Sequence, residues 1–373
     1  MIRVGITGQA GFMGQHLYNL LGTRPEEVSR VDFHRSFFED ADKLQDWVSN
    51  CDVIVHIAAM NRHEDPQVIY DTNVGLVNKL ISACEAAAVT PKIIFSSSTQ
   101  EERDNLYGRS KRDGRAAFEK WAKRSGGTII SMVIPNVFGP FGKPFYNSFI
   151  ATFCHQLNTG ESPTIHQDAE VSLIYVNELL EAFYANITGD KSGVELDWVE
   201  ATSTHKVSDI LAKLEDFKSA YVDQGQVPNI TSDFDRNLFN TFTSFIPKDY
   251  FPRKFTMHTD DRGAFVEIMR AGTSGQSSYS TTVPGITRGN HYHTRKVERF
   301  AVISGKASIK LRKVNTDKVY EYILDGNEPA YVDMPIWYTH NITNIGDTEL
   351  ITLFWINEPY DPADPDTYFE SVD

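Results

Sequence analysis

The chain has 373 residues, of which 41% are hydrophobic and 23% charged, and its formal net charge is −14 at pH 7. This composition is typical of a globular protein with a substantial core, and the length favours two or three domains. The negative charge argues against nucleic acid and against an anionic membrane surface as partners. Three scattered cysteines without a C-x-x-C spacing favour reduced thiols in a cytoplasmic protein, and no signal segment or transmembrane run is expected.

The first predicted elements are a strand, a glycine-rich turn and a helix. Ile2–Ile6 is a mostly apolar run that leads to Gly8, Gly11 and Gly14, and amphipathic sequence follows. The glycines let the backbone turn sharply and approach a ligand, and the helix points its free N–H groups at that ligand. A dinucleotide pyrophosphate is the usual occupant of such a turn. The alternative is an ordinary glycine-rich turn, and the flanking strand and helix favour the dinucleotide.

A second strand is predicted over Val28–Phe33, with His34 and Arg35 at its end. In dinucleotide-binding folds this position faces the adenosine ribose. An acidic residue there binds the 2′-hydroxyl of NAD, whereas an arginine accommodates the 2′-phosphate of NADP. Asp32 is expected inside the strand, so Arg35 favours NADP; the alternative is that Arg35 is only a surface residue.

Helices and apolar strands then alternate along the chain. The expected strands are Asp52–Ala59, Lys92–Phe95 and Ile129–Ile134, and the expected helices are Ala41–Val48 and Val74–Ala88. This alternation predicts an α/β fold, a doubly wound parallel sheet with helices on both faces.

Tyr107 and Lys111 stand four residues apart at the start of a helix predicted to run to about Arg124. They share one helical face, so the ammonium of Lys111 is expected to lower the pKa of the Tyr107 phenol. The phenol would then exchange a proton near neutral pH. Ser98, at the end of the preceding strand, is placed to hydrogen-bond the same substrate oxygen.

Residues 1–245 resemble the nucleotide-sugar branch of the extended short-chain dehydrogenase/reductase family. The resemblance rests on Thr7–Gly14, the strand DVIVHIAA, Tyr107-x-x-x-Lys111 and Pro135–Pro140. It implies a Rossmann-type domain in which Tyr107 protonates the alkoxide, Ser98 polarises the carbonyl and Lys111 holds the nicotinamide ribose. It also implies NADP(H)-binding residues, namely Gly8, Gly11, Phe12, Met13, Gly14, His34, Arg35, Ala58, Asn73, Tyr107 and Lys111. The loop from Ser98 to Tyr107 is shorter than the family often has.

The substrate subdomain is expected over residues 140–245. Phe145–Leu157 is predicted to be a helix, as is Val207–Phe217, and Leu173–Val176 a strand. Phe145, Tyr146 and Asn147 are candidate sugar or uracil contacts, and the family motif adds Asn136. The alternative is that the aromatic residues belong to the core and that Asn147 caps the helix.

From about residue 250 the pattern changes to short strands separated by Gly, Asn and Asp, which predicts an all-β sandwich or barrel. His291 and His293 alternate on one strand and therefore face the same way. Glu298 and His340 can reach that face from neighbouring strands. Three histidines and a glutamate suit a divalent metal, with zinc as the first candidate. The alternative is a set of core histidines without a site.

This region resembles the cupin family, which implies a jelly-roll domain over residues 250–373. Gly285–Gly305 matches the motif G-x5-H-x-H-x4-E-x6-G, and Pro335, His340 and Asn344 match a second motif, with Trp337 where a glycine is usual. The segment from Arg288 to His291 also resembles sugar 3,5-epimerases, in which the aligned histidine is a metal-free base. The role of His291 as metal ligand or as base therefore stays open.

The order of reductase and cupin in one chain resembles the bifunctional capsular polysaccharide synthesis enzymes over its full length. This resemblance implies C3 epimerisation of a UDP-4-keto-6-deoxy-N-acetylhexosamine in the cupin, then NADPH-dependent reduction at C4. The implied product is UDP-N-acetyl-6-deoxytalosamine, on the route to UDP-N-acetyl-L-fucosamine. A 4-ketone acidifies the C3 proton, and Arg288 or a metal can stabilise the enolate that its removal creates.

Two other functions stay open. One is a single-activity reductase whose cupin binds sugar or is structural. The other is an NADP-sensing scaffold, against which the intact set of Ser98, Tyr107 and Lys111 counts. A homodimer is expected, and the acidic tail Asp361–Asp373 is expected to pack on a partner or to be disordered.

Overall fold

The computed structural model describes residues 1–260, 263–266, 268–269, 275–358 and 360–373. The chain divides into two compact units: residues 1–152 with 166–207, and residues 153–165 with 208–373. Residues 208–245 thus group with the C-terminal sheets, and the division expected near residues 245–250 stays a prediction.

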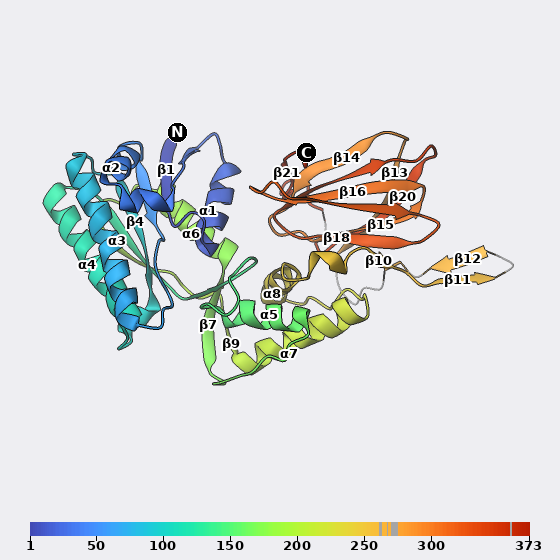
Figure 1. The fold of residues 1–373 in the computed structure, drawn as a ribbon, viewed down its shortest axis with the longest axis horizontal. Helices are drawn as coiled ribbons and strands as arrows, with labels where there is room; N and C mark the ends of the chain where they lie inside the picture. Colours follow the sequence, from blue (N-terminus) through green and yellow to red (C-terminus); the bar gives the residue numbers. More distant parts are fainter. Residues whose placement is uncertain (261–262, 267, 270–274, 359) are drawn as a thin grey trace. The chain divides into compact units, whose positions relative to one another are not determined.

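The N-terminal unit is built on a six-stranded sheet whose neighbouring strands are all parallel (Figure 1). Its strands, in spatial order, are β2 (Val28–Val31), β1 (Ile2–Thr7), β3 (Val53–His56), β4 (Lys92–Ser98), β5 (Ile129–Ile134) and β8 (Val194–Trp198). From β1 the chain crosses to β2 on one side and later to β3 on the other. Dinucleotides bind at the carboxyl ends of strands beside such a reversal.

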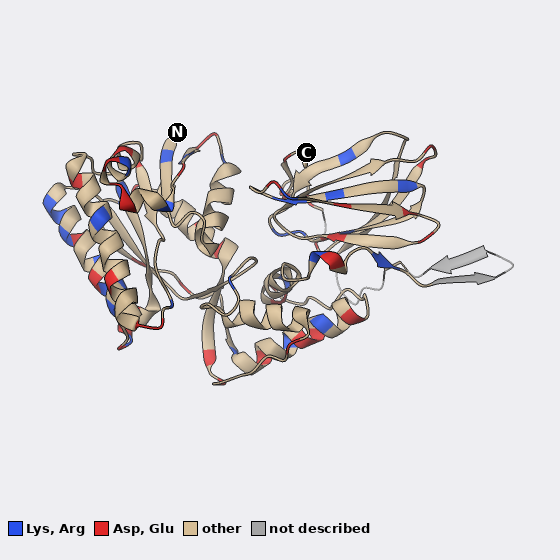
Figure 2. Ribbon diagram, in the orientation of Figure 1, with Lys and Arg blue, Asp and Glu red and all other residues tan. Residues whose placement is uncertain are grey.

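Helices cover this sheet, and they are α1 (Phe12–Gly22), α2 (Ala41–Ser49), α3 (Pro66–Ala86), α4 (Leu106–Ser125) and α6 (Val176–Thr188). A core shared by α2, α3, α4 and the sheet includes Trp47, Leu80, Phe118 and Trp121. Lys and Arg outnumber Asp and Glu along α4 (Figure 2), where Arg115 pairs with Glu119 at 2.8 Å. The α/β fold expected from the sequence is confirmed.

A smaller three-stranded sheet completes this unit, and α5 (Phe149–Thr159) runs across the boundary between the two units. Its strands are β6 (Asn136–Phe138), β7 (Glu170–Tyr175) and β9 (Ser203–Lys206). None of the helices that the structure describes combines the length and apolar character needed to cross a bilayer.

Several element ends differ from the sequence-based expectation. Helix α3 begins at Pro66 rather than Val74, because the Asp65 side chain accepts a hydrogen bond from Gln67 N at 2.9 Å and caps the first turn. Helix α5 begins at Phe149 rather than Phe145. Strand β2 ends at Val31, so Asp32 lies outside the strand, contrary to our prediction.

The C-terminal unit contains two five-stranded antiparallel sheets (Figure 1). One consists of β10 (Arg253–Lys254), β18 (Ala330–Met334), β15 (Glu298–Ser304), β20 (Leu350–Ile356) and β13 (Gln276–Thr282). The other consists of β17 (Val319–Asp325), β16 (Lys306–Lys313), β19 (Tyr338–Asn344), β14 (Thr287–Tyr292) and β21 (Tyr368–Phe369). Strands β11 (Met257–Asp260) and β12 (Gly263–Val266) pair with each other and lie between β10 and β13 in the chain. The predicted all-β region is confirmed.

The buried Arg299 on β15 links helical segments of the same unit to these sheets. The segments are α7 (Val207–Phe217), a π-helical turn at Lys218–Asp223, and α8 (Asp233–Thr243). Arg299 pairs with Asp333 at 2.8 Å and also donates to the carbonyl of Gly225 at 3.2 Å. Its guanidinium lies 3.9 Å from the ring centroid of Tyr331, so the cation is enclosed by groups of the β domain.

The acidic tail is ordered on its own chain, contrary to the alternative that it is disordered, and its packing on a partner stays a prediction. Strand β21 pairs with β14, and Arg312 donates to the backbone carbonyls of Ser371 and Val372 and to the carboxylate of Glu370. Basic side chains of the β domain therefore neutralise the tail.

Candidate functional site

The glycine turn after β1 is built by close backbone contacts that only glycine permits. A Cβ on Gly8, whose φ is +79°, would lie 2.8 Å from Ala58 N, and a Cβ on Gly14 would lie 2.1 Å from Gly8 O. The N-cap of α1 is Gly11, which has no side chain to cap the helix. The first N–H groups of α1, from Phe12, Met13 and Gly14, are consequently left for a ligand at this turn, as anion-binding helices require.

The end of β2 carries an acidic residue that the prediction had placed inside the strand. Asp32 directly follows the strand, and its carboxylate accepts a hydrogen bond from the Tyr18 hydroxyl at 2.6 Å. His34 caps the short helical turn Arg35–Glu39 through Ser36 N, and Arg35 is exposed. Both an acid and an arginine thus stand near the position where the adenosine ribose is expected.

Three of the predicted catalytic residues come from adjacent elements of the N-terminal unit. Ser98 is the last residue of β4, while Tyr107 and Lys111 lie in the first two turns of α4. The Lys111 ammonium donates to Ser96 O at 2.8 Å and lies 5.8 Å from the Tyr107 ring centroid. Lys111 thus lies beside Tyr107 and against the end of β4, and Ser98 Oγ accepts a hydrogen bond from Gln100 N at 3.2 Å.

The expected electrostatic effect of Lys111 on Tyr107 is wrong for this structure. Burial, with a smaller effect of the nearby Tyr146, raises the pKa of Tyr107 to about 12. Burial also lowers the pKa of Lys111 to about 8, although Glu101 opposes this shift. Desolvation disfavours the charged form of each group.

Hydrogen bonds and close packing hold the short loop between Ser98 and Tyr107 in place, through residues that no sequence motif indicated. Glu101 is buried and accepts hydrogen bonds from the Ser97 hydroxyl and from Arg115, at 2.8 Å for Nη2. A Cβ on Gly108 would lie 1.9 Å from Gln100 O, so the loop packs directly on α4. In the sequence, only the short length of this loop indicated that it packs closely on α4.

The side chain of the buried Asn73 hydrogen-bonds to the backbone of Met60 and to the side chain of Ser110. It accepts from Met60 N at 2.7 Å and donates to Met60 O at 3.1 Å and to Ser110 Oγ at 3.0 Å. It therefore holds the segment after Ala58 against α4, and its predicted direct contact with the coenzyme stays a prediction.

The candidate substrate residues of the N-terminal unit lie in loops and at a strand edge. Asn147 is exposed, and Ser148 rather than Asn147 caps α5, through Ala151 N at 3.2 Å. Phe145 is 51% exposed, which excludes it from the core. Tyr146 accepts a hydrogen bond from Asn61 N at 3.1 Å, and the exposed Asn136 donates to Ser172 O at 3.4 Å.

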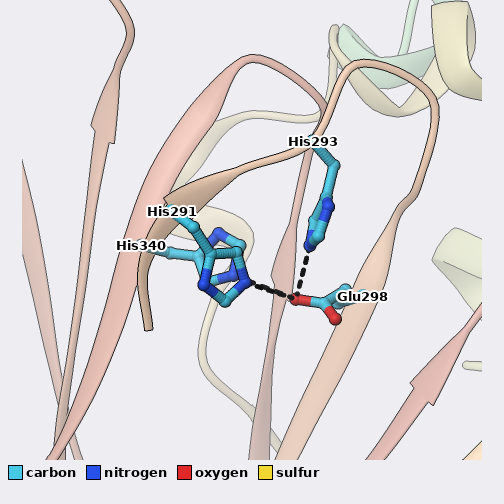
Figure 3. A group of neighbouring side chains, drawn as sticks. All are labelled: His291, His293, Glu298 and His340. Carbon is cyan, nitrogen blue, oxygen red and sulfur yellow. Dashed lines mark ion pairs between the residues drawn. The ribbon is translucent and has the colours of Figure 1, made fainter. Parts of the chain in front are cut away.

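In the C-terminal unit, His291, His293, Glu298 and His340 come together as predicted (Figure 3). Their ligand atoms lie within 4.8 Å of one another. The Nε2 atoms of His340, His293 and His291 lie 2.9, 3.3 and 4.0 Å from Glu298 Oε2. Among the described residues, the buried Nε2 atoms of His293 and His340 and Oε2 of Glu298 have no hydrogen-bond partner of normal geometry. Metal coordination would satisfy these atoms.

Backbone carbonyls orient two of the three imidazoles. His340 Nδ1 faces Tyr338 O at 3.1 Å, and His293 Nδ1 bonds to Asp366 O. Because a carbonyl only accepts, each Nδ1 carries the proton and each Nε2 lone pair is left for the cluster. Burial lowers the pKa of His291 to about 4, and the other two histidines act in the same direction.

A β-bulge places Arg288 on the face that carries the histidines. Arg288 pairs with Ile342 and His291 pairs with His340, and the register shifts between Gly289 and His291. Residues 340 and 342 are two apart on β19, so Arg288 and His291 share a face of the sheet. Arg288 is exposed, as a residue at the mouth of a binding site would be.

Trp337 replaces the usual glycine without preventing the turn. It adopts a φ of 60°, and its N–H donates to His293 O at 2.8 Å. Its buried ring stacks on Tyr292 with a centroid distance of 5.5 Å. Packing and a backbone hydrogen bond thus offset a conformation that costs about 1–2 kcal/mol for a non-glycine residue.

Two family descriptions cover most of the chain. Residues 4–198 match the NAD dependent epimerase/dehydratase family, and residues 258–368 match a polysaccharide biosynthesis C-terminal domain.

Individual relatives match from end to end. The UDP-2-acetamido-2,6-beta-L-arabino-hexul-4-ose reductase of Pseudomonas aeruginosa is 33% identical over 372 residues, covering 100% of this chain and 99% of that protein. The capsular polysaccharide assembling protein CapF of Staphylococcus aureus is 33% identical, with a TM-score of 0.60 and 100% of both chains covered. RMD of P. aeruginosa complexed with NADPH, at 18% identity and a TM-score of 0.57, covers 66% of this chain and 99% of its own and shares the fold.

Proposed function

The chain belongs to the NAD dependent epimerase/dehydratase family, and from that premise we propose that it is a two-step nucleotide-sugar enzyme. In this proposal the C-terminal domain epimerises C3 of a UDP-4-keto-6-deoxy-N-acetylhexosamine, and the N-terminal domain then reduces C4. The product is UDP-N-acetyl-6-deoxytalosamine, on the route to UDP-N-acetyl-L-fucosamine. The observation that carries the proposal is the end-to-end similarity to a reductase named for a UDP-linked hexul-4-ose.

Reduction at C4 needs a proton for the developing alkoxide. Bound NADPH supplies the hydride. Tyr107, with a pKa raised to about 12, keeps its proton at neutral pH and is suited to donate it to the sugar oxygen. Ser98 polarises the same carbonyl, and the ammonium of Lys111 holds the coenzyme ribose and stabilises negative charge as it forms.

NADPH is the proposed coenzyme because Arg35 is exposed and can meet a 2′-phosphate, whereas Asp32 is engaged by Tyr18. Comparison of kcat/KM for NADPH and NADH, in the wild type and in Arg35→Ala, tests this choice. Arg35→Ala should weaken use of NADPH and leave NADH unaffected. Equal use of the two coenzymes by the wild type would contradict the proposal.

Epimerisation at C3 needs a base and a stabilised enolate. Without a bound metal, the neutral His291 can accept a proton, and Arg288 on the same face supplies positive charge. The four clustered side chains also fit a divalent metal, for which we propose zinc held by His291, His293, Glu298 and His340. When bound, such an ion polarises an oxygen ligand as a Lewis acid. A metal-free enzyme that still exchanges the C3 proton would assign His291 as the base instead.

One observation favours a simpler alternative, a single-activity reductase with a sugar-binding or structural cupin. The similar P. aeruginosa protein is named as a reductase alone. In that case His291→Asn would leave turnover of the supplied keto-sugar intact.

Turnover of the UDP-4-keto-6-deoxy sugar in deuterated water tests both half-reactions, with products analysed by mass spectrometry and NMR. Deuterium at C3 without NADPH, and a C4-reduced product with it, is the expected result. His291→Asn should lose only the exchange and Tyr107→Phe only the reduction. Reduction without deuterium incorporation would reject the epimerase step and leave the simpler reductase.

We further propose that the protein is a cytoplasmic homodimer, because oligomers are common among such folds. Sedimentation of the full chain measures this directly, and a monomer at micromolar concentration would contradict it.

A further inference from the structure

The C-terminal tail meets the strand that carries the histidine cluster. Phe369 of β21 pairs with His291, and Tyr368 pairs with Tyr292. Just before this strand, Asp366 is only 3% exposed and has a φ of 41°, in the left-handed region. Asp and Asn adopt this region more readily than most residues, but a buried carboxylate there is costly unless it is well bonded.

The Asp366 carboxylate is bonded to a single turn, residues 294–296, which follows His293. Oδ1 accepts from Thr294 Oγ1 at 2.6 Å and from Thr294 N at 3.1 Å. Oδ2 accepts from Arg295 N at 3.0 Å and from Lys296 N at 3.2 Å. One side chain therefore satisfies three consecutive backbone N–H groups.

The backbone of Asp366 acts on the cluster itself. Its carbonyl accepts a hydrogen bond from His293 Nδ1, and the opposite ring atom, Nε2, lies 3.3 Å from Glu298 Oε2. A second anchor nearby, from Lys296 Nζ to Pro365 O at 2.7 Å, holds the same stretch of tail. The tail and the turn after His293 are thus fastened to each other at two points.

We infer that Asp366 is a positioning residue for the cluster. Its carboxylate fastens the tail to the turn 294–296, so that its carbonyl holds His293 with the proton on Nδ1 and the Nε2 lone pair directed at the metal position. This inference rests on the proposed metal site. Partners of this kind that orient ligand histidines commonly change metal affinity by about 10–100-fold when removed.

Zinc affinity of the purified full-length chain, measured by competition with a chelator, tests the inference. Asp366→Gly tolerates the positive φ but removes the carboxylate, and it should weaken zinc binding about 10–100-fold. Asp366→Asn retains an acceptor oxygen and should lose less. Asp364→Asn is the matched control, because it removes only an exposed ion pair with Arg295 from the same tail and should bind zinc as the wild type does.

NMR of ¹⁵N-histidine-labelled, metal-free protein adds a readout that loss of stability alone would not move. His293 should be the Nδ1–H tautomer in the wild type and a mixture in folded Asp366→Gly; if that variant does not fold, Asp366→Asn carries the comparison. Wild-type zinc affinity together with an unchanged tautomer would overturn the inference. A failure of the proposed metal site would give a different result. The wild type would then not bind zinc, although the tautomer of His293 would still depend on Asp366.

Discussion

At the scale of single residues, burial decides the charge states of the reductase site. Lys111 is enclosed and has a pKa lowered to about 8, whereas the pKa of Tyr107 is raised to about 12. Below about pH 8 the site therefore holds an ammonium and a neutral phenol, which is the combination that donates a proton to an alkoxide. As the pH rises through 8, the ammonium is lost first.

We expect kcat/KM for keto-sugar reduction to fall above about pH 8, because this parameter reports the ionisation of the free enzyme. The measurement is a profile from about pH 6 to about pH 10, across the range in which Lys111 titrates. In Lys111→Arg the charge persists, so the remaining activity should lack this alkaline limb. A wild-type profile that stays level to about pH 10 would show that Lys111 does not control the reaction.

The sequence predicted the site residues unequally, for physical reasons. Local spacing places His291 with His293 and Tyr107 with Lys111, because strand and helix geometry convert it into a shared face. Glu298 and His340 reach the cluster from other strands. The pKa directions did not follow, since desolvation depends on the neighbours that folding supplies. Asp366 carries no motif and lies 73 residues from His293, so its role depends on a tertiary contact.

At the scale of elements, the turn between β1 and α1 leaves no room for a Cβ at Gly8 or at Gly14. In Gly14→Ala the new Cβ would lie 2.1 Å from Gly8 O, so the turn must open. We expect NADPH affinity, measured by fluorescence titration, to fall by at least about tenfold, or about 1.4 kcal/mol.

Gly75→Ala in α3 is the matched control, because nothing lies within 4 Å of its Cβ. It should keep the affinity and stabilise the helix by up to about 1 kcal/mol. Equal affinity in both variants would mean that the turn does not form the coenzyme site.

A second prediction at this scale concerns the buried pair of Arg299 and Asp333, whose side chains are 1% and 4% exposed. Arg299→Met leaves a buried carboxylate without its partner, and the free energy of unfolding of the C-terminal unit should fall by about 3–5 kcal/mol. Urea denaturation followed by a probe in the β domain measures this loss.

The exposed pair of Arg3 and Asp52, with side chains 47% and 43% exposed, provides the comparison. Arg3→Met should cost less than about 1 kcal/mol. If Arg299→Met costs no more than that, the buried pair contributes no more to stability than the exposed pair does.

At the scale of the whole molecule, the sequence predicted the order of folds, whereas the boundary between the domains stays a prediction. Apolar runs locate the parallel strands, and the change to short β-branched runs locates the antiparallel sheets. The grouping of residues 208–245 with the C-terminal unit depends on contacts such as Arg299 with Gly225, which no local pattern announces. The order of the tail was not predicted for the same reason, because its charges are neutralised by distant basic residues.

Each candidate site draws its side chains from one unit: Ser98, Tyr107 and Lys111 from the first, and the histidine cluster from the second. A defect in one site should therefore leave the other functional.

We expect a mixture of Tyr107→Phe and His291→Asn to form the C4-reduced, C3-epimerised product although neither variant does so alone. The epimerised keto-sugar would leave one chain and be reduced on the other, so the rate should rise with enzyme concentration after a lag. Product detection by NMR checks this, with each half-reaction assayed separately. If both halves are active and the mixture still forms no product, the intermediate does not pass through solution. If His291→Asn alone makes the wild-type product, the β domain takes no part in the chemistry.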